Sequence, residues 1–253
     1  MILVADNLNG LNPEIARAME DLDPKPIEKL VKRCENMGVR VIDINPGHLP
    51  KRKEDRMRFL VETVQAAGSM DLILDSPNPR LVEIGLSACT RPPIVNALSM
   101  EEMKLTEILP MAVEHGTDLV ALLMDERSYT PPSIEEKLAL AIELRERSLS
   151  AGMPAEKLIF DPVLPNLSWD DAFFRVAESI KAVRLLASGA VFQEPVRTMA
   201  GLSNLRSGLR RKYPWQIEEA CLYMLAGAGL EYALADVTTK EFQTAAGLIA
   251  RLS

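Results

Sequence analysis

The sequence has few of the residues from which metal and redox sites are built. It contains two histidines, His48 and His115, and no pair of histidines at the spacing that binds zinc on a helix. Both are more typical of solvent-facing or helix-terminal positions than of a catalytic site. The three cysteines, Cys34, Cys89 and Cys221, lie far apart and form no CxxC pair, which is typical of free thiols in a reducing compartment. We therefore expect no protein-bound metal.

Dense blocks of basic residues and long apolar runs are also missing. The formal net charge is −7, and the absence of a Lys/Arg block argues against a nucleic-acid or anionic-membrane surface. No apolar run approaches the length that crosses a bilayer, and residues 1–6 become polar too soon for a signal peptide. We expect a cytoplasmic protein that binds neither nucleic acid nor membrane.

Glycine-rich phosphate loops of the open α/β type are absent as well, since the sequence has no GxxxxGK[ST] and no GxGxxG after its first apolar run. What the sequence does contain is a regular alternation of short apolar runs and helical patterns, without an internal linker. The expected strands cover residues 2–5, 39–44, 71–75, 93–96, 118–124, 157–161, 199–202 and 232–235. Eight βα units in about 250 residues favour a closed parallel barrel over an open doubly wound sheet. We predict a single-domain (β/α)8 TIM barrel over residues 1–253.

The helices are expected between these strands. They cover residues 24–38, 57–68, 78–85, 99–115, 133–151 and 216–228, a helix within residues 166–186, and a last helix capped by Thr238 or Thr239. Residues 6–10 are expected to form a polar loop after the first strand.

Polar side chains recur at the carboxyl ends of the expected strands. They comprise four acids, four amides and two hydroxyls: Asp43, Asp75, Asp161, Asp236, Asn9, Asn45, Asn96, Asn204, Ser76 and Ser203. Any one of them can be a turn or helix-cap residue. In a parallel barrel, however, all of these strand ends face the same mouth. Their repetition therefore predicts a polar site there.

The chemistry of these side chains favours a ligand rich in N–H groups. No Lys or Arg stands at the strand ends, so a phosphate group finds no obvious partner there. A carboxylate accepts two parallel N–H bonds from an amidine-like edge, and an Asn matches a ring that shows a carbonyl beside an N–H. A reduced pterin has such an edge.

The segments around these residues resemble the pterin-binding methyltransferases, and most closely the methyltetrahydrofolate:corrinoid protein methyltransferases. The resemblance follows nearly the whole chain in order. It rests on Asn9-Gly10, residues 41–47, Leu74-Asp75-Ser76, Val95-Asn96, residues 112–116, residues 160–162, Gly201-Leu202-Ser203-Asn204 and Ala235-Asp236.

This resemblance implies a homodimeric (β/α)8 barrel and an enzyme of one-carbon metabolism. It implies methyl transfer between N5 of tetrahydrofolate, as 5-methyltetrahydrofolate in one direction, and the cobalt of a cobalamin-type corrinoid carried by a separate corrinoid protein. Its implied site residues fall into three groups. Asp75, Asn96 and Asp161 hold the pterin ring, Asn204 approaches N5 with Asp43 supporting the network, and Asn9, Ser203 and Asp236 match family positions at the mouth.

Some residues depart from the family pattern. Ala5-Asp6-Asn7 stands where relatives commonly show Gly-Glu-Arg, and Arg206, Arg210 and Arg211 make the segment after Asn204 more basic than in relatives. This basic segment is either a contact for the partner or a solvated helix face.

Two alternatives stay open at this point. One is a dihydropteroate synthase-like enzyme, although the Ser-Thr-Arg-Pro-Gly and Lys-Gly-Ser-Arg types of loop shown by those relatives are absent. The other is a catalytically silent pterin-binding barrel. The direction of methyl transfer and the pathway also stay open.

Overall fold

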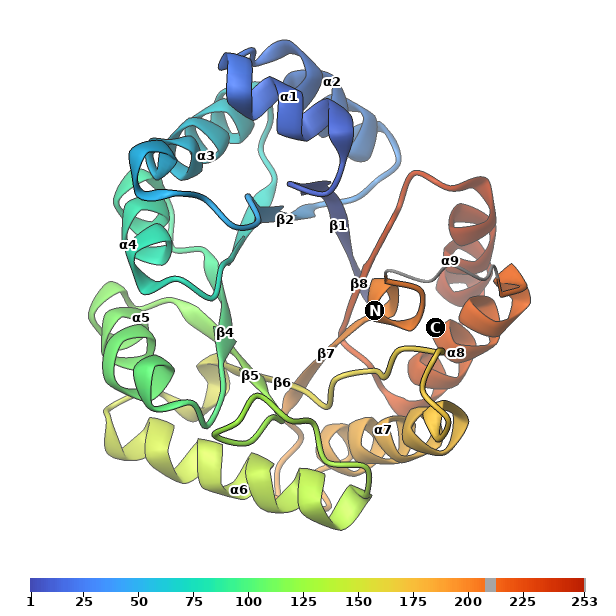
Figure 1. The fold of residues 1–253 in the computed structure, drawn as a ribbon. Helices are drawn as coiled ribbons and strands as arrows, with labels where there is room; N and C mark the ends of the chain where they lie inside the picture. The colour runs from blue at the N-terminus through green and yellow to red at the C-terminus, as the bar shows by residue number, and fades with distance from the viewer. Residues whose placement is uncertain (208–212, 253) are drawn as a thin grey trace.

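The structure, a computed structural model, describes residues 1–207 and 213–252 of the 253-residue chain. Eight strands close into one parallel barrel, in which each strand pairs with the next and the last pairs with the first. They are β1 (Ile2–Asn9), β2 (Val41–Asn45), β3 (Asp71–Asp75), β4 (Ile94–Leu98), β5 (Asp118–Leu122), β6 (Leu158–Asp161), β7 (Arg197–Gly201) and β8 (Tyr232–Ala235). Figure 1 looks along the barrel and shows the helices outside the ring of strands. The predicted (β/α)8 barrel is confirmed.

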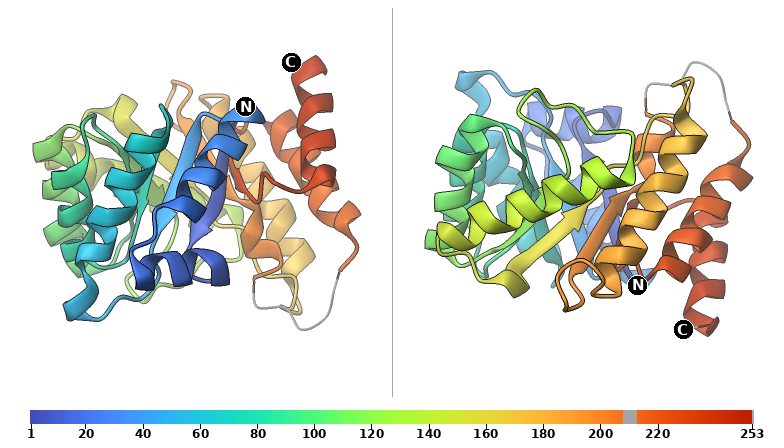
Figure 2. Two further views of the ribbon diagram at one scale, coloured as in Figure 1. Left: turned by 90° about the horizontal axis from the view of Figure 1, so that it is seen from above. Right: turned by 90° about the horizontal axis from the view of Figure 1, so that it is seen from below.

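The helices surround the strands on the outside, as the two side views of Figure 2 show. They are α1 (Pro13–Asp21), α2 (Lys25–Asn36), α3 (Asp55–Ala67), α4 (Pro79–Ala88), α5 (Leu109–His115), α6 (Ile134–Ser150), α7 (Ala172–Ala187), α8 (Trp215–Ala228) and α9 (Lys240–Leu252). A π-helical turn, Lys104–Ile108, leads directly into α5. Within the described residues no helix is both long enough and apolar enough to span a bilayer.

The first βα unit differs from the prediction. Strand β1 continues through residues 6–9, which the sequence indicated as a loop, and its pairing with β2 shifts in register between Ala5 and Leu8. The side chain of Leu8 is fully buried, which ties this extension to the core. Helix α1 was not predicted; the Asn12 side chain caps it by accepting a hydrogen bond from Glu14 N.

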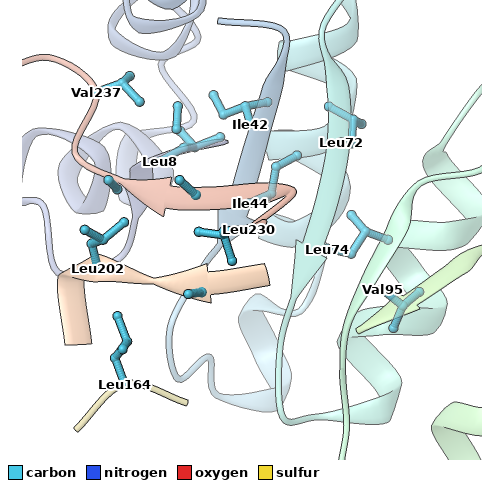
Figure 3. Packing of buried hydrophobic residues seen from close by; sticks show 14 of the residues in the cluster. Leu8, Ile42, Ile44, Leu72, Leu74, Val95, Leu164, Leu202, Leu230 and Val237 are labelled. Atoms are coloured by element: carbon cyan, nitrogen blue, oxygen red, sulfur yellow. The ribbon is translucent and has the colours of Figure 1, made fainter. Parts of the chain in front are cut away.

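Alternation along the strands divides the apolar core into two layers. Side chains such as Ile42, Ile44, Leu72 and Leu74 point outward and pack under the helices, and Figure 3 shows several of them. The inner layer consists of Val4, Val41, Ile73, Ala97, Ile94, Val120, Ile159, Met199, Tyr232 and Leu234. Because side chains on a strand change face with every residue, the residue two places further along also faces the interior, nearer the mouth. The polar residues among these next interior positions are Asp6, Asp43, Asp75, Asn96 and Asp161.

An ion-pair network lies at the other end of the barrel interior. Arg197 of β7 pairs with Asp118 of β5 and with Glu231, and it also donates a hydrogen bond to the Tyr232 hydroxyl. Lys157 adds a second cation 3.5 Å from Asp118. Asp118 at this end of the barrel is therefore paired with two cations, Arg197 of β7 and Lys157, which directly precedes β6.

Gly10 sets how closely the first two loops of the mouth approach each other. Its N–H donates to the Asn45 carbonyl over 2.8 Å, and a Cβ at residue 10 would lie 2.5 Å from the Pro46 carbonyl oxygen. We expect Gly10→Ala to lower the free energy of unfolding by about 1–3 kcal/mol, because backbone must move to remove the clash. Chemical denaturation measures this loss.

Gly227 of α8 provides the matched control. A Cβ there would have no atom within 4 Å, so Gly227→Ala should leave stability unchanged or raise it by about 0.5–1 kcal/mol. Equal destabilisation by both substitutions would contradict the role given to Gly10.

Candidate functional site

The mouth of the barrel contains a cavity of about 380 Å³. Four of the predicted site residues, Asp75, Asn96, Asp161 and Asn204, line it together. They come from β3, β4, β6 and the turn after β7, so the closed barrel assembles them from positions far apart in the sequence. The remaining described residues of its lining are Ser76, Pro77, Ala97, Glu101, Lys104, Leu122, Met124, Ser128, Gly201 and Leu234.

Asp75 and Asn96 are direct neighbours in the barrel, because β3 and β4 pair in register at these two residues. The Asn45 amide donates to Asp75 Oδ2 over 2.8 Å. Burial raises the pKa of Asp75 to about 6, although the hydrogen bond from Asn45 and the charge of Lys104 both act to lower it. Asp75 is thus a carboxyl group with fewer stabilising partners than its ionised form requires.

Asp161 is buried, and burial raises its pKa to about 7. Its Oδ1 accepts a hydrogen bond from Val163 N over 2.7 Å, in a turn where Val163 has a φ of 57°. Behind this turn, the fully buried Lys137 of α6 donates to the Pro162 carbonyl over 2.6 Å. Desolvation lowers the pKa of Lys137 to about 8, while the charge of Asp161 acts to raise it. Lys137 therefore supports the turn that carries Asp161.

Asp43 is buried beside the cavity, and its Oδ1 has no hydrogen-bond partner among the described residues. Burial raises its pKa well above the ordinary value, and the charges of Asp75 and Asp6 raise it further. A side-chain hydrogen bond with Asn96 acts in the opposite direction. Asp43 thus interacts with two residues that line the cavity, Asp75 and Asn96, and its supporting role there stays a prediction.

Three further predicted residues, Asn9, Asp236 and Ser203, are not among the described residues that line the cavity. Asn9 forms a turn, since its amide donates to the Asp6 carbonyl and its Oδ1 accepts from Leu11 N. Asp236 likewise accepts hydrogen bonds from the Asn7 amide and from Thr238 N. Both residues therefore have local structural roles at the rim.

Ser203 leads to a residue that the sequence prediction missed. It hydrogen-bonds to Asp6, whose partial burial raises its pKa to about 6 despite that bond. The signal was present in the sequence, because Asp6 follows the interior residue Val4 by two places on β1. Assigning residues 6–10 to a loop concealed it.

An ion pair inside the cavity was also missed. Lys104 Nζ lies 2.7 Å from Glu101 Oε2, and the Lys104 side chain is buried. Burial acts to raise the pKa of Glu101, but hydrogen bonds from Lys104, Ser128 and Ser99 outweigh it and hold that pKa at about 2. Strand-end patterns could not reveal this pair, because it comes from the segment that follows β4 and leads into α5.

The basic segment after Asn204 is described only in part. Arg206 pairs with Glu218 of α8, and its guanidinium lies 5.8 Å from the centroid of the Trp215 ring. Arg210 and Arg211 lie outside the described residues. His48 is exposed, and His115 is the exposed last residue of α5.

The raised pKa of Asp75 predicts a pH-dependent cost to stability. Because the folded protein holds the Asp75 proton more tightly than the unfolded chain does, its contribution to stability is complete below about pH 4. This contribution is lost as the pH rises through about 6. We expect Asp75→Asn, which can still accept from Asn45, to raise the free energy of unfolding above pH 7 by between about 1 and 3 kcal/mol. Near pH 3.5 the variant and the wild type should converge.

Denaturant unfolding across this pH range measures the effect, with Asp170→Asn at an exposed position as the matched control. If the stability of Asp75→Asn falls with rising pH as steeply as that of the wild type, Asp75 is not a cause of the pH-dependent loss of stability.

The chain matches a family of known proteins over most of its length. The family described as pterin binding enzyme matches residues 12–234, a range that contains Asp43, Asp75, Asn96, Asp161 and Asn204. Asn9 and Asp236 lie outside that range.

Two curated relatives are enzymes of methyl transfer. The chain is 25% identical over 248 residues to the methylcorrinoid:tetrahydrofolate methyltransferase of Eubacterium limosum, an alignment that covers 97% of this chain and 88% of that protein. It is 21% identical over 243 residues to the methionine synthase of Mycobacterium leprae (strain TN), covering 92% of this chain but 20% of that longer protein.

Solved structures of dihydropteroate synthases share the fold. The enzyme from Thermus thermophilus superposes with a TM-score of 0.70 at 18% identity, covering 100% of this chain and 94% of that one. A Yersinia pestis dihydropteroate synthase in complex with a sulfonamide drug gives 0.69 at 16% identity, covering 99% and 93%. At these identities the likeness shows the fold alone. The family match, which covers most of the sequence, shows that the chain belongs to the pterin binding enzymes.

Proposed function

We propose that the protein transfers a methyl group between N5 of tetrahydrofolate and the cobalt of a corrinoid carried by a partner protein. The observation that supports this proposal most strongly is one cavity lined by Asp75, Asn96, Asp161 and Asn204. The similarity to the Eubacterium limosum methyltransferase over nearly the full length of both chains supports it further.

The cavity suits the hydrogen-bonding edge of a reduced pterin. That edge presents an amino group, a ring N–H and a carbonyl, and it carries no charge. Asp75 and Asp161 offer carboxylate oxygens that accept N–H bonds, and the Asn96 amide both donates and accepts. Since burial raises the pKa of both acids, N–H donors from the ligand would stabilise their ionised forms. The poorly compensated carboxyl groups thus match a ligand that supplies donors.

In this proposal Asn204 acts on N5. Its side chain reaches the cavity from the turn after β7, and its backbone carbonyl accepts from the Asn166 amide over 3.3 Å. Gly201 leaves room for it, since a Cβ at residue 201 would lie 3.3 Å from Asn204 Nδ2. When methyltetrahydrofolate loses its methyl group, N5 develops negative charge unless it is protonated or strongly hydrogen-bonded. A hydrogen bond from Asn204 that strengthens during bond breaking lowers this barrier.

No side chain of the protein needs to act as a nucleophile in this reaction. Reduced cobalt is itself the nucleophile toward methyltetrahydrofolate, and in reverse free N5 attacks the methyl group on cobalt. The protein's contribution is to position the two large substrates relative to each other. This positioning lowers the activation barrier by several kcal/mol. We extend the proposal to a cytoplasmic homodimer that acts on a separate corrinoid protein, as the sequence resemblance implies. Light scattering of the purified protein tests its dimeric state.

An anaerobic assay tests the reaction. Purified protein is mixed with methylcobalamin and tetrahydrofolate, and separately with cob(I)alamin and methyltetrahydrofolate, while the absorbance of cobalt is followed. We expect transfer in at least one direction. Asn204→Ala should slow it by about 10²–10³-fold, as expected for the loss of one donor to a developing anion. Asn36→Ala, at an exposed position on α2, should leave the rate unchanged.

Two outcomes would contradict the proposal. Condensation of a pterin pyrophosphate with p-aminobenzoate, without methyl transfer, would instead support a dihydropteroate synthase-like enzyme. Tight folate binding without turnover, even with corrinoid proteins added, would support a silent pterin-binding barrel. An unchanged rate for Asn204→Ala would remove Asn204 from the mechanism.

A further inference from the structure

A second cavity, of about 590 Å³, adjoins the candidate pterin cavity. The two cavities share Met124, Ser128 and Asn204 in their linings. The second one lies between the loop that joins β5 to α6 and the loop that joins β6 to α7. No predicted role for any site residue uses this space.

The second cavity has an aromatic rim. Four aromatic side chains rank among the exposed large hydrophobic residues of the described chain, namely Tyr129, Trp169, Phe173 and Phe174. Tyr129 and Trp169, which are 49% and 46% exposed, line the cavity, whereas Phe173 and Phe174 do not. Exposing large aromatic rings to water is unfavourable, and their grouping beside a cavity is typical of a binding surface.

Arg175 of α7 holds these two rings in place. Its guanidinium lies 5.2 Å from the centroid of the Trp169 ring and 5.6 Å from that of Tyr129. The same group donates to the Tyr129 hydroxyl, the Thr130 carbonyl and the Asp171 carboxylate. The rings are therefore ordered before any ligand binds, which reduces the entropy lost on binding.

The pairing of Arg175 with Asp171 also limits which ligands fit. Arg175 Nε lies 2.8 Å from Asp171 Oδ2, so the two charges inside the lining compensate each other. A phosphate or pyrophosphate would have to compete with Asp171 for this guanidinium. A flat, uncharged aromatic group can instead stack on the rings without breaking the ion pair.

The covalent structure of tetrahydrofolate places such a group in this direction. Carbon C6 of the pterin, which carries the tail, is bonded directly to N5. In the proposed function Asn204 approaches N5, and Asn204 stands on the boundary of the two cavities. The first atom of the tail is therefore two bonds from N5, and the first large group of the tail is the p-aminobenzoyl ring.

We propose that the second cavity binds the p-aminobenzoyl ring of the folate tail, stacked against Trp169 and Tyr129. The proposal rests on the proposed function, because it takes the pterin to lie in the first cavity. The glutamate part of the tail then extends past the rings toward solvent. Trp169 thereby distinguishes a folate from a pterin that has no tail.

Two ligands test this subsite in anaerobic titrations. Tetrahydrofolate carries the tail, and 6-methyltetrahydropterin has the same ring system with only a methyl group at C6. We expect Trp169→Ala to weaken tetrahydrofolate binding about five- to tenfold, the effect of losing one aromatic stacking partner, and to leave 6-methyltetrahydropterin binding unchanged. Trp169→Phe should recover most of the affinity for tetrahydrofolate.

Phe173→Ala is the matched control, since Phe173 is 62% exposed in the same region but does not line the cavity. This variant should bind both ligands as the wild type does. The backbone hydrogen bonds made by Trp169 N and O are available to alanine as well, and circular dichroism checks that the Trp169→Ala variant is folded.

Other results would overturn the subsite. Equal weakening of both ligands would mean that Trp169 supports the pterin cavity itself. If Trp169→Ala binds both ligands as tightly as the wild type does, the aromatic rim does not bind the folate tail. This holds whether or not transfer to a corrinoid protein slows. If the wild-type protein binds 6-methyltetrahydropterin as tightly as tetrahydrofolate, the tail adds no affinity. That result would overturn the subsite but leave the proposed function standing. A wild type that binds neither ligand would overturn both.

Discussion

The burial of carboxyl groups at the mouth of the barrel is the constraint on which the candidate site depends. Strand alternation places Asp43, Asp75 and Asp161 at interior positions just beyond an apolar layer. Burial is the largest cause of the raised pKa of each. Burying these carboxyl groups destabilises the fold. A closed barrel with continuous parallel pairing tolerates this loss, because its apolar layers and backbone hydrogen bonds form without the residues at the mouth. Such destabilising groups persist where they serve binding or catalysis.

The acidic side chains at the two ends of the barrel interior differ in their cationic partners. At the base, Asp118 has two cationic partners, Arg197 and Lys157. At the mouth, the cations that influence the acids are already engaged: Lys104 pairs with Glu101, and Lys137 donates to the Pro162 carbonyl. The carboxyl groups of the mouth are thus left to accept N–H groups from a ligand. This difference supports the proposal that the mouth binds a neutral, donor-rich pterin in preference to an anionic ligand.

The sequence predicted most of the barrel, because both the strand pattern and the strand-end residues follow from local alternation. It also predicted part of the cavity lining, because Asp75 and Asp161 end their strands and Asn96 lies near the end of β4. It failed where the chain leaves that pattern. Asp6 was missed because a shift in register hides the extension of β1. Lys104 and Lys137 come from segments outside the strands, so only the folded barrel brings them to the site.

Calorimetric titration with tetrahydrofolate under anaerobic conditions tests the central claim most directly. If pterin N–H groups stabilise the ionised forms of Asp75 and Asp161, whose pKa values are about 6 and 7, binding near pH 6.5 must release protons. Titrations in buffers of different ionisation enthalpy count these protons. We expect net release near pH 6.5 that disappears at pH 8.5, where both groups are already ionised. Binding without proton release near pH 6.5, or no binding at all, would contradict the account.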